Sequence, residues 1–225
     1  MTLHVWLAFV AASAIMLLVP GPTVLMVVGD ALANRSRRSG APDKPGFGLL
    51  GCKAWGTVAG VASADFTAMT LSLAGAGALL EASAAAFTFM KTLGGLYLIY
   101  LGVKSILGAR RSPAQPKPLA GGSGPTMLAR FSKAYAVTVL NPKSILFFVA
   151  FVPQFISAHA SFLGQSGVLL ATFTALSLLN SSTYSLLATL VGGRLTTASA
   201  QRKVGYAGGC TLIGAGALTL AIHRS

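Results

Sequence analysis

Long apolar runs, separated by short polar segments, dominate this chain. A helix needs about 20 mostly apolar residues to cross the hydrocarbon core of a bilayer. Windows of that kind lie at 5–29, 46–71, 83–108, 130–156, 163–191 and 204–222. The pattern predicts an all-α membrane protein with six transmembrane helices.

Composition agrees with a membrane location. The chain is 54% hydrophobic and 9% charged, and its mean hydropathy is +0.72, whereas soluble domains carry roughly a quarter charged residues. Its longest polar segment, around 109–128, is rich in Pro, Gly and Ser, which is typical of a flexible linker. We therefore expect one membrane domain, 1–225, in which this linker joins a first part, 1–108, to a second part, 129–222.

Basic residues gather in alternate polar segments. They follow the first, third and fifth windows: Arg35, Arg37, Arg38 and Lys44, then Arg110, Arg111, Lys117 and Arg130, then Arg194, Arg202 and Lys203. Because basic loops are retained in the cytoplasm, we expect these segments to be cytoplasmic, the linker included, and both termini to be periplasmic. Contact with acidic lipids of the inner leaflet explains most of the net charge of +13, so no nucleic-acid partner is expected.

The first apolar window is interrupted by Pro20, Gly21 and Pro22, in the stretch "LVPGPTVLMVV" at 18–28. Proline has no amide N–H and crowds the carbonyl four residues before it. A carbonyl left without a partner in hydrocarbon costs several kcal/mol. The break must therefore face a cavity or a neighbouring helix, and a simple packing kink is the alternative.

The two halves of the chain show a weak internal repeat. An offset of 120 residues aligns Pro22 with Pro142, and an offset of 114 aligns "LGGLYLIYLG" at 93–102 with "AGGCTLIGAG" at 207–216. Each half carries three predicted spans, so the second must enter the membrane from the opposite side. Two inverted three-helix repeats with broken helices are typical of secondary transporters.

Four motifs together resemble those of the LysE/RhtB family of amino-acid exporters. They are, in order, "VPGPTVLMV" in the first window, "GVASADF" at 60–66, "MKTLGGLYLIYLG" at 90–102 and "LNPKSILFFVAFVPQF" at 140–155. The similarity runs from residue 1 to about 156. It implies a small exporter of amino acids or close derivatives in the bacterial inner membrane, driven by proton antiport and homo-oligomeric.

Thr23 is a departure from the family pattern, which usually has an acidic or amide residue directly after Pro-Gly-Pro. Its hydroxyl can bind a substrate or a backbone carbonyl but carries no charge. Together with the lack of a second acid expected inside the membrane, this favours neutral or polar amino acids over lysine or arginine as substrates.

Asp65 is the acid that we expect inside the bilayer, because Asp30, Asp43 and Glu81 lie at or near predicted loops. An ionisable group there costs about 3 kcal/mol or more and indicates function. At 1.5 Å per residue, Asp65 and Lys91 lie roughly 9 and 12 Å below the same membrane boundary. We hypothesise that Asp65 alternates between a salt bridge with Lys91 and a protonated or substrate-bound state. A static ion pair is the alternative.

The fourth and fifth windows supply further candidate residues. Asn141 can cap freed backbone groups, Pro142 makes the break, and Lys143 either faces the substrate or extends to the cytoplasmic surface. Asn180 falls opposite Asp65 at an offset of 115 residues. It either contributes to the substrate pathway or binds neighbouring helices.

Other function classes are disfavoured. An intramembrane enzyme needs an acid–base or metal constellation, and the sequence offers no HExxH motif, paired intramembrane acids or Cys/His cluster. We therefore expect no catalytic residues, metal or cofactor. A thiol-disulfide electron carrier would place cysteines beside the prolines, but Cys52 and Cys210 lie apart from Pro20, Pro22 and Pro142. An uncoupled channel remains the principal alternative.

Overall fold

Seven α-helices and one short 3-10 helix form the described part of the chain. The computed structural model describes residues 1–19, 21–38, 51–82, 84–110, 125–157 and 160–191, with 206, 207, 209, 210, 212–214, 216, 217 and 220. The helices are α1 (Leu3–Leu18), α2 (Pro22–Arg38), α3 (Gly51–Ala82), α4 (Ala84–Arg110), α5 (Met127–Val139), α6 (Pro142–Ala150), η1 (Val152–Phe155) and α7 (Phe162–Val191). No strand occurs among these residues.

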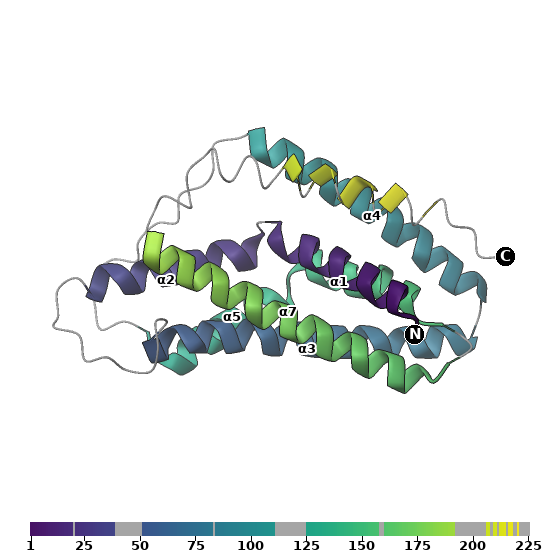
Figure 1. The fold of residues 1–225 in the computed structure, drawn as a ribbon, viewed down its shortest axis with the longest axis horizontal. Helices are drawn as coiled ribbons and strands as arrows, with labels where there is room; N and C mark the ends of the chain where they lie inside the picture. The colour runs from purple at the N-terminus through teal and green to yellow at the C-terminus, as the bar shows by residue number, and fades with distance from the viewer. Residues whose placement is uncertain are drawn as a thin grey trace.

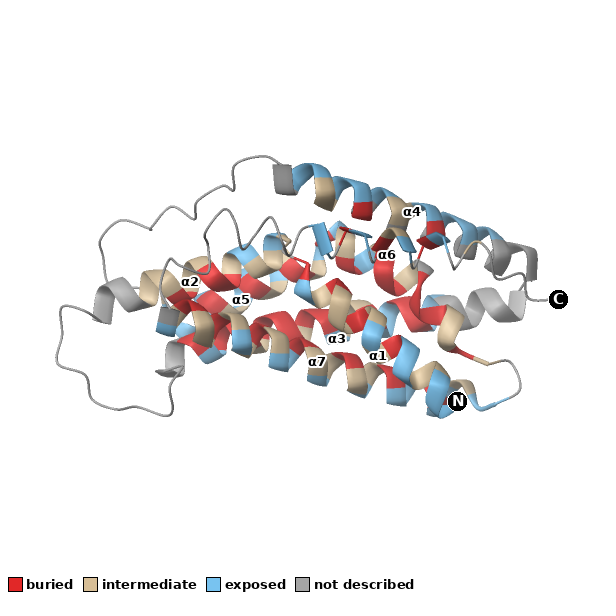
Figure 2. Cartoon of the chain, turned by 45° about the horizontal axis from the view of Figure 1, so that its top comes forward, coloured by how far each residue is buried: buried red, intermediate tan, exposed pale blue. Residues whose placement is uncertain are grey.

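The helices form an elongated bundle (Figure 1). Helix α3 packs chiefly against α5 and α7, and α2 also packs against α7. Helix α4 lies along one edge with the described pieces of the C-terminal segment beside it (Figure 1). Buried residues gather where α1, α2, α3, α5, α6 and α7 face one another, while α4 is largely exposed (Figure 2).

Two stretches, Ala54–Gly75 in α3 and Phe162–Leu190 in α7, are each long and apolar enough to cross a membrane. Two bent pairs of helices also qualify if each pair is one span: α1 with α2, bent by 57°, and α5 with α6, bent by 54°. Helix α4 contains a shorter apolar stretch, Gly95–Gly108. The protein is thus an all-α, multi-pass membrane protein, and the number of six spans stays a prediction.

Both bends lie where the prolines predict breaks. Pro22 is the first residue of α2 and Pro142 the first residue of α6. Proline suits the first position of a helix because the N–H that it lacks would have no partner there. Pro20 lies outside the described residues.

The structure corrects the expected positions of Asp30 and Arg130. Helix α2 continues to Arg38, so Asp30 lies within the helix rather than near a loop. Arg130, counted above with the loop charges, lies in the first turn of α5 and is only 3% exposed. Its Nη1 atom is 2.5 Å from Oδ2 of Asp30. The ion pair explains the difference, because each charge gives the other a partner inside the bundle.

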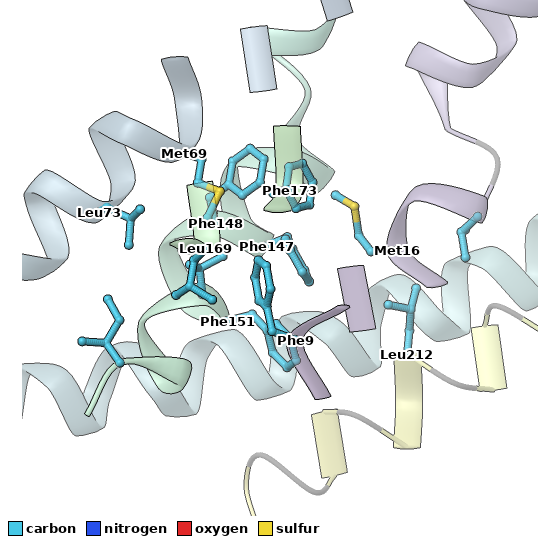
Figure 3. Close-up of a cluster of buried hydrophobic side chains, with 13 residues drawn as sticks. Phe9, Met16, Met69, Leu73, Phe147, Phe148, Phe151, Leu169, Phe173 and Leu212 are labelled. Carbon is cyan, nitrogen blue, oxygen red and sulfur yellow. The ribbon is translucent and has the colours of Figure 1, made fainter. Parts of the chain in front are cut away.

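Phenylalanine side chains fill the core around the second break. Phe147, Phe148 and Phe151 extend from α6 and its end, and pack with Phe173 of α7 and Phe9 of α1 (Figure 3). The ring centroids of Phe148 and Phe173 are 4.8 Å apart in an edge-to-face arrangement, which is a favourable geometry for aromatic pairs. This packing holds the short helix α6 against α1 and α7.

Candidate functional site

A cavity lies where the two helix breaks meet α3 and α7. Six residues singled out in the sequence line it: Gly21, Thr23, Asp65, Asn141, Lys143 and Asn180. These residues come from both halves of the chain and from elements far apart in sequence. The breaks therefore open onto a shared cavity rather than onto lipid alone.

The end of α1 exposes backbone carbonyls to this cavity. In an α-helix, the carbonyl of residue i accepts from the N–H of residue i+4. Residues 20 and 22 are prolines, so the carbonyls of Met16 and Leu18 have no such donor. In an apolar environment these groups need partners from elsewhere.

Lys143 binds one of these two carbonyls and a third carbonyl nearby. Its Nζ atom donates to the carbonyl of Met16 at 2.5 Å and to that of Val19 at 2.7 Å. The Met16 carbonyl is the one that Pro20 leaves free. The Lys143 ammonium thus lies at the end of the broken helix, inside the cavity.

Two neutral side chains of α7 bind the intervening carbonyls. Asn180 Nδ2 donates to the carbonyl of Leu17 at 3.3 Å, and the Tyr184 hydroxyl donates to that of Leu18 at 2.9 Å. The Leu18 carbonyl is the one that Pro22 leaves free. Four consecutive carbonyls at the C-terminal end of α1, from Met16 to the C-cap residue Val19, thus accept from three side chains of the second half.

The second break is linked to the first through Thr23. Asn141 caps α6, because its side-chain oxygen accepts from the backbone N–H of Lys143 at 3.1 Å. The Nδ2 atom of Asn141 donates to Thr23 Oγ1 at 3.2 Å, and the Thr138 hydroxyl donates to the same oxygen at 3.4 Å. The neutral Thr23 side chain therefore joins α2 to both sides of the α5–α6 break.

Asp65 is the acidic group of the cavity. It lies on α3 and is 3% exposed, and its Oδ2 atom accepts a hydrogen bond from Ser177 Oγ at 2.6 Å. Ser181, one turn later on α7, donates to the backbone carbonyl of Ser177. Asp65 and Lys143 interact electrostatically across the cavity, with no direct salt bridge between them in the described structure.

The other predicted site residues either do not line the cavity or have side chains outside the described part of the structure. Pro142 is exposed at the start of α6, and Pro22 begins α2 without lining the cavity. Lys91 belongs to α4, but its side chain lies outside the described residues. The pairing of Asp65 with Lys91 therefore stays a prediction. Within the described residues, no three His, Cys, Asp or Glu side chains are grouped to hold a metal.

Sequence reasoning missed the serines and the tyrosine of α7. Ser177, Ser181 and Ser185 are buried and recur every four residues, which places them on one face of the helix. Ser177 and Ser181 line the cavity, as does Tyr184. The regular spacing of serines in an otherwise apolar helix was the available signal, whereas nothing distinguished Tyr184 in the sequence.

Comparisons with known proteins identify similar sequences. The family model described as LysE type translocator matches residues 50–223. Leucine efflux proteins from Enterobacter sp. (strain 638) and Salmonella typhimurium are 32% and 33% identical over 172 and 170 residues, which is 76% of this chain and 72% and 71% of theirs.

A protein from Vibrio cholerae, named only as a membrane protein, is 28% identical over 218 residues, or 97% of each chain. No solved structure matches the chain significantly. The family model covers more than half of the sequence, and relatives above 30% identity match over three quarters of it. The chain belongs to the LysE type translocator family.

Proposed function

We propose that this protein exports a neutral amino acid by proton antiport through the cavity between its two helix breaks. The observation that carries the proposal is the composition of that cavity, which brings the broken end of α1, bound by the Lys143 ammonium, together with the buried carboxylate of Asp65. Family membership and the leucine efflux proteins among its relatives support amino-acid export by a transporter rather than an enzyme.

The lining of the cavity suits an amino acid with an apolar side chain. Hydroxyl, amide, ammonium and carboxylate groups can bind the charged ends of a zwitterion. Leu17, Val24, Val27 and Val61 supply apolar surface in the same cavity. A few polar groups in a mainly apolar cavity are typical of small-molecule sites, and we propose leucine or a similar amino acid as the substrate.

Asp65 is the proposed coupling residue. It is a buried carboxyl group on the cavity wall whose described partner is a neutral hydroxyl, Ser177. A carboxyl in that setting can bind either a proton or a cationic group. Exchange of one for the other during the transport cycle would link inward proton flow to outward movement of substrate. Lys91 remains a proposed second partner.

We also propose six spans arranged as two inverted repeats, 1–108 and 129–222, joined by the cytoplasmic linker 109–128. The similar bends of 57° and 54° support this arrangement, as do reciprocal glycine contacts. A Cβ added at Gly95 would lie 3.2 Å from the Gly216 carbonyl, and one at Gly102 would lie 2.5 Å from that of Gly209. The offset of 114 residues exchanges these two contacts, as an inverted repeat requires.

The proposed repeat and the charge distribution support a proposed location and orientation. We propose the bacterial inner membrane, with the basic segments cytoplasmic and both termini periplasmic. A homo-oligomer is proposed from the family resemblance alone.

Uptake into inverted membrane vesicles tests the function. Vesicles containing the protein, and vesicles without it, receive labelled leucine, threonine or lysine under an imposed pH gradient. We expect saturable leucine uptake that stops when a protonophore removes the gradient. Uptake that ignores the gradient would support an uncoupled channel, and uptake of no amino acid above the background would contradict the proposal.

A further inference from the structure

We propose that the Lys143 ammonium is a displaceable occupant of the α1 carbonyls, and that the primary ammonium group of the substrate replaces it there during transport. The inference rests on the proposed function, because it specifies how the substrate binds in that cavity. It assigns a binding site to the carbonyls of Met16 and Val19 and makes a free ammonium group the feature that this site recognises.

The carbonyls of Met16 and Val19 already bind one ammonium group, that of Lys143. A lysine ammonium has three N–H donors and no acceptor. Two of its contacts in this protein are the carbonyls of Met16 and Val19, at 2.5 and 2.7 Å. The α-ammonium of an amino acid carries the same three donors. Any group that fits these carbonyls as Lys143 does must compete with Lys143 for them.

A permanent cap would not need a charge. The neighbouring carbonyls of Leu17 and Leu18 are capped by the neutral side chains of Asn180 and Tyr184. Neutral donors therefore suffice at this helix end, whereas a charged group inside a membrane protein is costly and marks a functional position. The charge on Lys143 fits a group that must imitate another cation and then leave.

The displaced ammonium has a partner within the same cavity. Asp65 lines the cavity with Lys143 and interacts with it electrostatically, without a direct salt bridge in the described structure. Lysine carries its charge on a flexible four-carbon stem, so we infer that the displaced ammonium turns towards Asp65. After the substrate binds, the Lys143 ammonium is thus paired with the Asp65 carboxylate rather than left without a partner.

The proposal predicts which compounds bind. Leucine and leucinamide both carry a primary ammonium, and leucinamide lacks the carboxylate. N-Acetyl-leucine keeps the carboxylate but has no ammonium. n-Butylammonium is an ammonium without any amino-acid framework. Leucine, leucinamide and n-butylammonium should compete with Lys143 for the carbonyls, and N-acetyl-leucine should not.

Binding of these four probes to the purified full-length protein, measured by calorimetry, tests the inference. The variant Lys143→Met removes the competing ammonium, and Lys133→Met is the matched control because Lys133 is exposed on α5. When a competing state is removed, apparent affinity rises by the reciprocal of the fraction of molecules in which the site was free, so a site that Lys143 leaves free in about a tenth of molecules gains about tenfold. We expect Lys143→Met to bind leucinamide and n-butylammonium about tenfold more tightly than the wild type, and Lys133→Met to bind like the wild type.

Lys143→Gln keeps the test decisive if Lys143→Met does not fold, because a glutamine amide can still donate to one carbonyl without a charge. Unchanged leucinamide affinity in the folded variant would overturn the inference and make Lys143 a structural cap. Equal binding of N-acetyl-leucine and leucine by the wild type would also overturn it.

The ammonium probe separates the inference from the proposed function. If no amino acid binds but Lys143→Met binds n-butylammonium more tightly than the wild type, amino-acid export fails and the ammonium site stands. If amino acids bind but Lys143→Met changes no affinity for ammonium probes, export stands and the inference fails.

Discussion

Single side chains from the second half of the chain complete the backbone of the first half. The carbonyls of Met16 and Leu18, which prolines leave without helix partners, accept from Lys143 and Tyr184 respectively. These hydrogen bonds offset the cost of the helix break and form a specific joint, that is, a hydrogen-bonded connection between α1, α6 and α7. Met16, Lys143 and Tyr184 also line the cavity, so the joint forms part of the candidate site.

Tyr184→Phe tests the capping of this joint. The variant leaves the Leu18 carbonyl without the hydroxyl donor that lies 2.9 Å away. Loss of one partner of a hydrogen bond costs about 1 kcal/mol or more, so we expect a lower thermal unfolding temperature in detergent. Tyr100→Phe is the control, because Tyr100 is exposed on α4. Equal unfolding temperatures for the two variants would contradict the capping role.

Asp65→Asn tests the coupling role. In the wild type, Ser177 Oγ lies 2.6 Å from the Asp65 carboxylate. An asparagine oxygen can still accept a hydrogen bond from this hydroxyl, but the asparagine side chain cannot exchange a proton. We expect loss of gradient-driven leucine uptake with a normal amount of protein in the membrane. Exchange of labelled for unlabelled leucine, which needs no net proton flow, should persist. Loss of the protein from the membrane would instead support a static structural role for Asp65.

The sequence predicted this part of the site only partly. Proline chemistry is local, so both breaks and the need for capping groups followed from the residues themselves. The capping partners did not, because Lys143 and Tyr184 lie more than 120 residues from the carbonyls that they bind. Lys143 was therefore placed between two alternatives, and Tyr184 was not singled out.

At the scale of elements, close backbone contacts hold the bundle around the cavity. Helices α3 and α5 approach closely through glycines: a Cβ added at Gly60 would lie 2.5 Å from the Phe131 carbonyl, and one at Gly56 would lie 2.6 Å from that of Met127. Small residues permit such an approach in membrane helices. The contact fixes α3, and with it Asp65, against the second half of the chain.

Gly60→Ala tests that contact. The added methyl would also lie 2.9 Å from Cβ of Ala134, and its other near neighbours are backbone atoms of Phe131. Because backbone cannot move aside as a flexible side chain can, the helices must separate. Overpacking of this kind typically costs about 1–3 kcal/mol. We expect less protein in the membrane and a lower unfolding temperature. Gly75→Ala is the matched control on the same helix, because nothing lies within 4 Å of its added Cβ. Equal behaviour of both variants would refute the close contact.

A buried ion pair joins α2 to α5 at a second place. Arg130 contacts Asp30 at 2.5 Å and donates to Asn34 Oδ1 at 3.0 Å, and Thr57 of α3 donates to the same Asp30 oxygen. The sequence did not reveal this pair, because each residue lay at the edge of an apolar window and resembled a loop charge. Helix ends are set by such tertiary partners as much as by local sequence.

Arg130→Met tests the ion pair. Removal of one partner of a buried pair is strongly destabilising because the other charge stays behind. Asp30 keeps 17% of its side chain exposed, so we expect about 3 kcal/mol, the lower end of the usual range. Thermal unfolding should show that adding Asp30→Asn recovers part of this loss. Lys133→Met, an exposed lysine on α5, is the control, and no recovery in the double variant would argue against the pair.

At the scale of the whole molecule, two bent helix pairs enclose one cavity, with α3 and α7 as its other walls. The all-α membrane fold followed from the apolar pattern and composition, which depend little on tertiary detail. The repeat suggested that the two breaks meet, but it did not predict which residues line the cavity, because that depends on how distant helices pack. Those residues include Thr23, Asp65, Asn141 and Lys143. We propose that the substrate passes through this cavity.

Substrate protection of a cavity thiol tests whether the substrate enters this cavity. Ser144 is buried and lines the cavity, so Ser144→Cys, made with Cys52 and Cys210 replaced by alanine, places a small thiol there. Ser132→Cys is the control, because Ser132 is exposed on α5. We expect leucine to slow maleimide labelling of Ser144→Cys several-fold and to leave that of Ser132→Cys unchanged. Labelling of Ser144→Cys at the same rate with and without saturating leucine would contradict this expectation.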